Sequence, residues 1–68
     1  MAGKYEKKLD YLSLRQGWLQ PMYVTKIKFS QYIVGVSYRG QSFISKEHPT
    51  HDLAREDAAF QAYKFYKS

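Results

Sequence analysis

The first third of the chain repeats apolar and uncharged residues with the period of an α-helix. Between residues 4 and 16, the charged residues all lie outside one face of a helix with about 3.6 residues per turn. This face consists of Tyr5, Leu9, Leu12 and Gln16. Gly17 supplies a stop signal, and Pro21 prevents the helix from continuing. The pattern predicts an amphipathic helix over residues 4–16.

From residue 23 onward the period changes to two, which is typical of β-strands. One face carries Tyr23, Thr25, Ile27 and Phe29, and in the next run one face carries Tyr32, Val34, Val36 and Tyr38. Only residues 30–31 separate these two runs. A tight turn is predicted at 39–40, because Gly40 tolerates positive φ, and Phe43 and Ile44 anchor a third strand. The three strands predict an antiparallel meander.

The last third returns to helical spacing. Pro49 suits the position before a helix, Thr50 can accept a hydrogen bond as N-cap, and Asp52 falls in the first turn, where the helix dipole favours it. One face then carries Ala54, Ala58, Ala62 and Phe65, with Ala59 beside it. Together the elements predict an α+β fold, α-β-β-β-α, with a three-stranded antiparallel sheet and both helices packed on one face.

Length and composition predict a single domain over residues 1–68. The chain has no cysteine, so neither a disulfide nor a Cys-rich zinc site can stabilise its small core. The apolar surface that such a core has to bury must therefore come largely from seven tyrosines, four phenylalanines and one tryptophan. The sequence offers no transmembrane helix and no secretory signal, which predicts an intracellular domain, cytoplasmic or nuclear.

The sequence favours neither catalysis nor a bound cofactor. It contains no nucleophile motif and no phosphate-binding loop, so we expect no enzyme activity, no small-molecule substrate and no cofactor. His48 and His51 have the spacing of a metal pair. They lack a third strong ligand nearby, so we expect no metal site, and ordinary surface residues are the simpler interpretation.

The net charge of +5 is concentrated in the first half of the chain. Residues 1–28 carry six cations and two anions, whereas residues 46–68 carry four of each. A basic surface favours nucleic acid or another anionic partner, but it also keeps small proteins soluble. The charge alone leaves both interpretations open.

Several short motifs lie in a fixed order on this pattern. Gly17-Trp18 follows the first helix and precedes Pro21-x-Tyr23. The second strand reads Tyr32-x-Val34-x-Val36 with Gly40 after it, and the second helix reads Ala54-Arg55-x-x-Ala58-Ala59. In this order the motifs resemble those of the double-stranded RNA-binding domain family over nearly the whole chain. The resemblance implies the same α-β-β-β-α fold and binding to double-stranded RNA.

In that family RNA is contacted by shape at three places. The first helix enters one minor groove, the loop between the first two strands reaches the next, and lysines at the start of the second helix meet the phosphates between. The chain departs from the family at all three. Tyr11 stands where the family has Glu or Gln, and the longer loop with its G-P-x-H signature is missing. His51 and Asp52 replace two lysines, leaving Arg55 as the retained cation.

The predicted function is therefore binding of double-stranded RNA through shape and backbone contacts, without base-sequence specificity and weakly. The candidate RNA-binding residues are Lys4, Lys7, Lys8, Tyr11, Arg15, Lys26, Lys28, Lys46, His51 and Arg55. A simpler interpretation of the helix cations is a solvated helix face. For the strand lysines it is a charged edge that discourages aggregation.

The same fold also permits an alternative function, a protein-interaction or dimerisation module that has lost most RNA binding. Leu53 and Phe60 lie on the second helix away from its alanine face, with Tyr63 nearby. Such a patch can bind a protein partner or a second copy of the chain. Packing against the first helix or the rim of the sheet is the simpler interpretation. The predicted partners are thus double-stranded RNA and, in the alternative, a protein, with no membrane involved.

Overall fold

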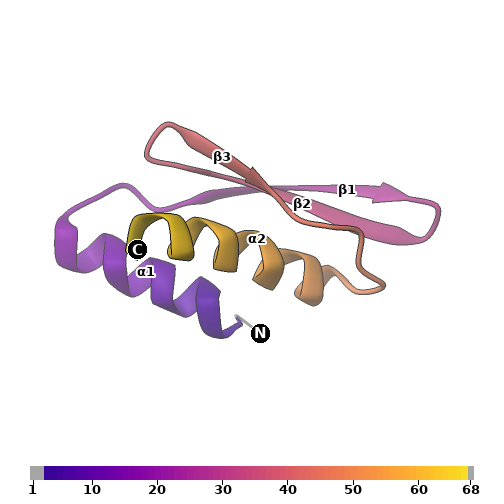
Figure 1. The fold of residues 1–68 in the computed structure, drawn as a ribbon, viewed down its shortest axis with the longest axis horizontal. Helices are drawn as coiled ribbons and strands as arrows, with labels where there is room; N and C mark the ends of the chain where they lie inside the picture. The colour runs from indigo at the N-terminus through magenta and orange to yellow at the C-terminus, as the bar shows by residue number, and fades with distance from the viewer. Residues whose placement is uncertain (1–2, 68) are drawn as a thin grey trace.

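The computed structural model describes residues 3–67, and its elements follow the predicted order. They are α1 (Lys4–Gln16), β1 (Met22–Lys28), β2 (Gln31–Tyr38), β3 (Gln41–Ile44) and α2 (His51–Lys67). Both helices lie on one side of the sheet, with α2 packed on β2 and β3 and α1 packed against α2 (Figure 1). The predicted α-β-β-β-α fold is confirmed. Neither described helix is long and apolar enough to cross a membrane.

The sheet is an antiparallel meander in the order β1-β2-β3. Its register pairs Tyr23 with Val36 and Val36 with Phe43, so these side chains share one face. All three belong to the core or pack against it, which makes this the face that the helices cover. The alternation predicted for the second strand is confirmed, whereas most of β1 is exposed.

Two-residue turns join the strands, and both place non-glycine residues at positive φ. The second turn is Arg39–Gly40, as predicted, with φ of 53° and 81°. The first turn is Phe29–Ser30, with φ of 50° and 63°, because Lys28 pairs with Gln31. The expectation that Phe29 continues the first strand is therefore wrong. A type I′ turn requires positive φ at both central residues, and it holds Phe29 at the tip of the hairpin.

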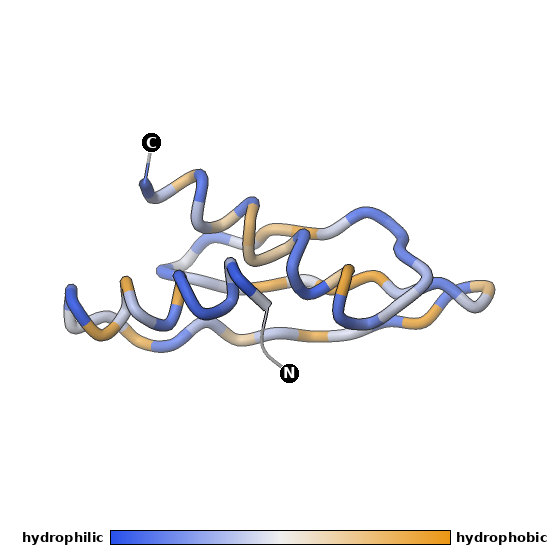
Figure 2. The backbone as a smooth tube through the Cα atoms, turned by 90° about the horizontal axis from the view of Figure 1, so that it is seen from below, coloured by the Kyte–Doolittle hydropathy of each residue, from blue (hydrophilic) through white to orange (hydrophobic). Residues whose placement is uncertain are grey.

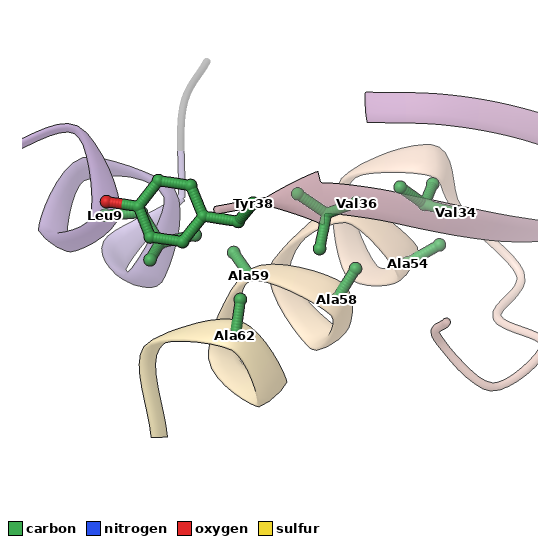
Figure 3. Close-up of a cluster of buried hydrophobic side chains, with 8 residues drawn as sticks. All are labelled: Leu9, Val34, Val36, Tyr38, Ala54, Ala58, Ala59 and Ala62. Atoms are coloured by element: carbon green, nitrogen blue, oxygen red, sulfur yellow. The ribbon is translucent and has the colours of Figure 1, made fainter. Parts of the chain in front are cut away.

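Four alanines let α2 lie close to the sheet. Figure 3 shows them along the helix, facing the valines of β2. Ala54, Ala58, Ala59 and Ala62 are fully buried, as are Val34 and Val36. Phe65, at the end of the predicted stripe, is half-exposed, with its ring edge-on to Tyr66 at 4.9 Å between centroids. The alanine face is confirmed, and the core is thin and rich in small side chains.

The buried face of α1 is displaced by one residue from the predicted stripe. Leu9 is fully buried as expected, but its buried neighbours are Glu6 and Ser13, and Gln16 is exposed. The Ser13 hydroxyl donates to the Leu9 carbonyl at 2.9 Å and shares a 2.6 Å hydrogen bond with the Tyr38 hydroxyl. Polar side chains can occupy this face because each finds a partner there.

The two ends of α1 are closed in different ways. Gly17 adopts φ of 71° at the C-terminal end, which confirms the predicted stop. At the other end Gly3 offers no side chain as a cap. The amides of Tyr5 and Glu6 donate instead to the Glu56 carboxylate of α2, at 2.9 and 3.3 Å. A β-carbon at position 3 would collide with that carboxylate, so a larger residue there would require the Glu56 side chain to move.

Aromatic rings enlarge the core at the end where the helices finish. The rings of Trp18 and Tyr66 lie 6.2 and 5.3 Å from that of Tyr38. Phe43 packs on Tyr66 from the sheet, and the Arg39 guanidinium lies 3.8 Å from the Trp18 ring centroid. Partly buried rings thus surround the small aliphatic core, which is the burial that a chain without cysteine requires.

Candidate nucleic-acid interface

The outer face of α1 carries cations and one tyrosine, all of them exposed. This set consists of Lys4, Lys7, Lys8, Tyr11 and Arg15. Helical periodicity turns these side chains away from the buried Leu9 and toward solvent. The structure thus gathers half of the predicted RNA-binding residues on one surface.

A groove of about 300 Å³ runs between α1 and α2, and we call it the basic groove. Its lining consists of Lys7, Lys8, Tyr11, Leu12, Arg15, Tyr63 and Lys67. All charged side chains in this lining are cationic. Lys67 was not among the predicted residues, because the sequence does not show that the end of α2 lies beside α1. A chain of phosphates suits such a row of cations.

Aromatic rings hold two of these cations in place. The Lys8 ammonium lies 5.6 Å from the ring centroid of Tyr5 and 5.4 Å from that of Tyr63. The Arg15 guanidinium lies 5.8 Å from the Tyr11 ring. Cation–π contacts at exposed sites stabilise a side-chain position by roughly 0.5–1 kcal/mol. The two charges are therefore partly ordered before any ligand arrives.

Arg55, the cation retained from the family pattern, is engaged within the protein. Its Nε and one terminal nitrogen donate to Glu6 Oε2 at 3.0 and 2.7 Å. The guanidinium also lies 4.2 Å from the Tyr23 ring centroid. The hydrogen bond to Glu6 raises the pKa of Arg55 above its usual value, so the side chain stays charged. This cation joins α1, α2 and β1 before it can meet a phosphate.

The two acidic residues of α1, Glu6 and Asp10, lie near Arg55 of α2 and Tyr23 of β1. Burial, reinforced by the Glu6 carboxylate, raises the pKa of Asp10. Burial also raises the pKa of the Tyr23 hydroxyl, whose oxygen is buried without a hydrogen-bond partner in the described part of the chain. The two flanks of α1 therefore differ in charge, and an anionic ligand is favoured on the flank that faces α2.

The N-terminus of α2 is closed by side chains rather than left open for a phosphate. The Leu53 amide donates to the Thr50 hydroxyl at 3.2 Å, which confirms the predicted N-cap. His51 Nε2 shares a 2.8 Å hydrogen bond with the Thr25 hydroxyl, and its ring lies 5.9 Å from that of Tyr32. Asp52 remains exposed at this end. The hydrogen bond between His51 and Thr25 thus joins the start of α2 to β1 of the sheet.

The loop before α2 is held by Asp57. Its carboxylate accepts hydrogen bonds from the Lys46 amide and from His48 Nε2, both at 2.9 Å. Burial alone would raise the pKa of Asp57, but these hydrogen bonds and one from Gln61 outweigh it and lower the pKa. The Lys46 side chain stays exposed. Within residues 3–67 no three His, Cys, Asp or Glu side chains form a group that could hold a metal ion.

The two strand lysines are separate from the basic groove. Lys26 and Lys28 are exposed on β1, on the half that leads to the first turn. Lys26 lies with Val24 and Ile33 on the sheet face opposite the helices. In Figure 1 this half of the hairpin extends past the helices toward the right-hand end. The cations of α1 and those of β1 therefore form two separate basic regions, and the basic groove includes none of Lys46, His51 and Arg55.

Two residues of the alternative protein-interaction patch, Phe60 and Tyr63, contact α1. The Phe60 ring meets Tyr5 edge-on at 4.8 Å between centroids, and Tyr63 lies 5.8 Å from the same ring. Leu53 is half-exposed at the start of α2. Packing against the first helix, the simpler interpretation of these rings, is what the structure shows.

Comparisons with known proteins define the class of the fold. Models of known protein families give no match, and a sequence comparison with curated proteins gives none either. Solved structures do match, and they show that the chain has the fold of a double-stranded RNA-binding domain. It is similar to the first such domain of DRB4, with a TM-score of 0.89 and 24% identity over 97% of this chain and 99% of that one.

Two further structures agree with this assignment of the fold. The second double-stranded RNA-binding domain of DRB4 gives a TM-score of 0.78 and 24% identity, over 97% of this chain and 99% of that one. A DRB4 structure that contains both domains and their linker gives a TM-score of 0.76 and 25% identity. The match covers 94% of this chain and 44% of that one. The resemblance read from the motifs is thus confirmed at the level of the fold.

Proposed function

We propose that the chain binds double-stranded RNA through shape and backbone contacts, without reading base sequence, and that residues 1–68 form one such domain. The observation that carries the proposal is the basic groove, whose charged lining is entirely cationic. A-form RNA hides its base edges, so a binding surface that presents cations and hydroxyls is suited to phosphates and 2′-hydroxyls. Tyr11 and Tyr63 supply those hydroxyls.

We expect this binding to be weak, for reasons visible in the contacts. Arg55 would have to leave the Glu6 carboxylate to meet a phosphate. Asp52 repels phosphate at the N-terminus of α2, and the two-residue turn at Phe29–Ser30 is too short to act as the family's longer loop. RNA binding therefore depends mainly on the cations of α1 and β1.

A titration with an RNA duplex of about 20 base pairs at several salt concentrations tests the proposal. With four to six phosphate contacts, the logarithm of affinity should fall against the logarithm of salt with a slope of roughly −3 to −5. A DNA duplex of the same sequence is the control, and it should bind more weakly because it lacks the 2′-hydroxyl. Absence of saturable RNA binding at low salt would overturn the proposal and leave protein interaction through the Leu53 and Phe60 surface as the alternative.

Replacing Glu6 by glutamine should release Arg55 toward RNA. We expect unfolding free energy to fall by about 1–2 kcal/mol, because the ion pair is only partly buried and glutamine keeps an acceptor. RNA affinity should rise a few-fold, and the salt slope should steepen by about 1 as one more cation meets phosphate. Thermal unfolding and anisotropy titrations measure the two effects.

Glu47→Gln is the matched control, because it removes the same charge from an exposed position of the loop. If both variants raise affinity equally, the gain reflects net charge alone and the release of Arg55 is not its cause.

A further inference from the structure

The tip of the β1–β2 hairpin carries an aromatic ring that does little for the fold. Phe29 is 88% exposed at the first position of the two-residue turn. The turn lies at the right-hand end of the molecule in Figure 1, and the same end includes hydrophobic positions in Figure 2. Its ring therefore meets water over nearly its whole surface.

The backbone at this position also disfavours phenylalanine. Its φ of 50° lies in the left-handed region, which is uncommon for bulky residues. A type I′ turn prefers asparagine, aspartate or glycine at its centre. An exposed ring in an unfavourable conformation lowers stability, and such strain concentrates at functional sites. The ring is better explained by a ligand than by folding.

The charges on the hairpin itself favour an anionic ligand. Lys26 and Lys28 precede the turn and are exposed. The sequence has no Asp or Glu between Asp10 and Glu47, so the hairpin carries only positive charge. An exposed ring beside cations is the combination that binds single-stranded nucleic acid, where the ring stacks on a base and the cations meet the backbone.

The chemistry of phenylalanine narrows the target further. The ring has no hydrogen-bonding group, so it cannot bind the hydroxyls of a duplex minor groove. It can stack on a base face, and base faces are free only at ends, bulges and loops. The molecule extends 38 Å along its longest axis, and the hairpin tip marks one end of that axis (Figure 1). The basic groove lies toward the other end, where both helices finish, so a duplex in the groove has to extend along this axis for its unpaired base to reach the tip.

We propose that Phe29 is a stacking site for an unpaired RNA base adjoining the duplex held by α1. The inference rests on the proposed RNA binding and adds to it a preference for RNA with unpaired bases. Duplexes with an overhang or a bulge bind more tightly than fully paired duplexes of equal length, and Phe29 alone carries the difference.

The test uses an RNA duplex of about 20 base pairs with 2-aminopurine, a base whose fluorescence falls on stacking, as its overhanging nucleotide. Wild-type protein should quench the fluorophore, and Phe29→Asn should abolish the quenching and weaken binding of this RNA by roughly 5- to 100-fold. The same variant should raise the thermal midpoint, because asparagine suits the turn. Phe29→Tyr should keep the quenching, and Ile27→Thr is the apolar control that should leave it unchanged.

If the fully paired duplex binds but quenching is absent, or if Phe29→Asn weakens both RNAs equally, the stacking site is wrong while the proposed RNA binding stands. If neither RNA binds at low salt, the proposed function fails and this inference fails with it. Quenching that survives in Phe29→Asn assigns the stacking to another residue and likewise overturns the inference.

Discussion

Leu9→Ala should lower the free energy of unfolding by about 2–5 kcal/mol, the range measured for leucine truncation in closely packed cores. Leu9 is fully buried, and it is the only large aliphatic side chain that the described part of α1 buries completely. A chain of 68 residues has a total stability of roughly 3–10 kcal/mol. The variant should therefore be partly unfolded at 37 °C, with a thermal midpoint lower by about 4–8 °C per kcal/mol.

The same helix provides the control. Leu14 is 74% exposed on α1, so Leu14→Ala makes the same chemical change without opening a cavity. Its effect should stay within about 0.5 kcal/mol. Urea unfolding of both variants compares them directly. Equal losses would mean that α1 is not held to α2 and the sheet through Leu9.

Removing three cations from the basic groove should have the largest effect on RNA binding. In the variant Lys7→Gln, Lys8→Gln, Arg15→Gln, each lost phosphate contact reduces the salt slope by about 1, so the slope should fall to between about 0 and −2. Affinity for the 20-base-pair duplex should fall by roughly 10- to 100-fold at moderate salt. Stability should change little, because all three side chains are exposed.

Single substitutions show whether position or net charge is responsible. Lys8→Gln removes one cation from the groove, and Lys64→Gln removes one from an exposed position of α2 outside the groove lining. Titrations at one salt concentration should give a greater loss for Lys8→Gln. A matching loss in Lys64→Gln would indicate that RNA is attracted by overall charge and that the groove is not the contact surface.

The elements were predictable because their signals are local. The helix over residues 4–16, the turn at Gly40 and the N-cap at Thr50 each depend on neighbours within a few residues, and all three are confirmed. The motifs then indicated the fold as a whole. The buried face of α1 was predicted less well, because Glu6 is a charged residue and lies outside the predicted apolar stripe. Its ion pair with Arg55 and a hydrogen bond from the Gly3 amide compensate for its burial.

The candidate site was predicted only in part, because its properties arise from contacts between distant segments. Arg55 matches a phosphate-binding position in sequence, yet its partner Glu6 lies 49 residues away. Lys67 joins the basic groove only through the packing of α2 on α1. Phe29 was expected in a strand because its run alternates, and a one-residue difference in the turn moved it to the tip. Spacing along the chain contains none of this information.

The closure of α1 by Glu56 also sets the order in which the molecule can form. The amides of Tyr5 and Glu6 find their acceptor 51 and 50 residues further along the chain. Isolated helices of this length are marginal in water, and this one begins at a glycine that supplies no cap of its own. The first helix therefore reaches its full stability only when the last one is in place, and the groove between them exists only once both helices have formed.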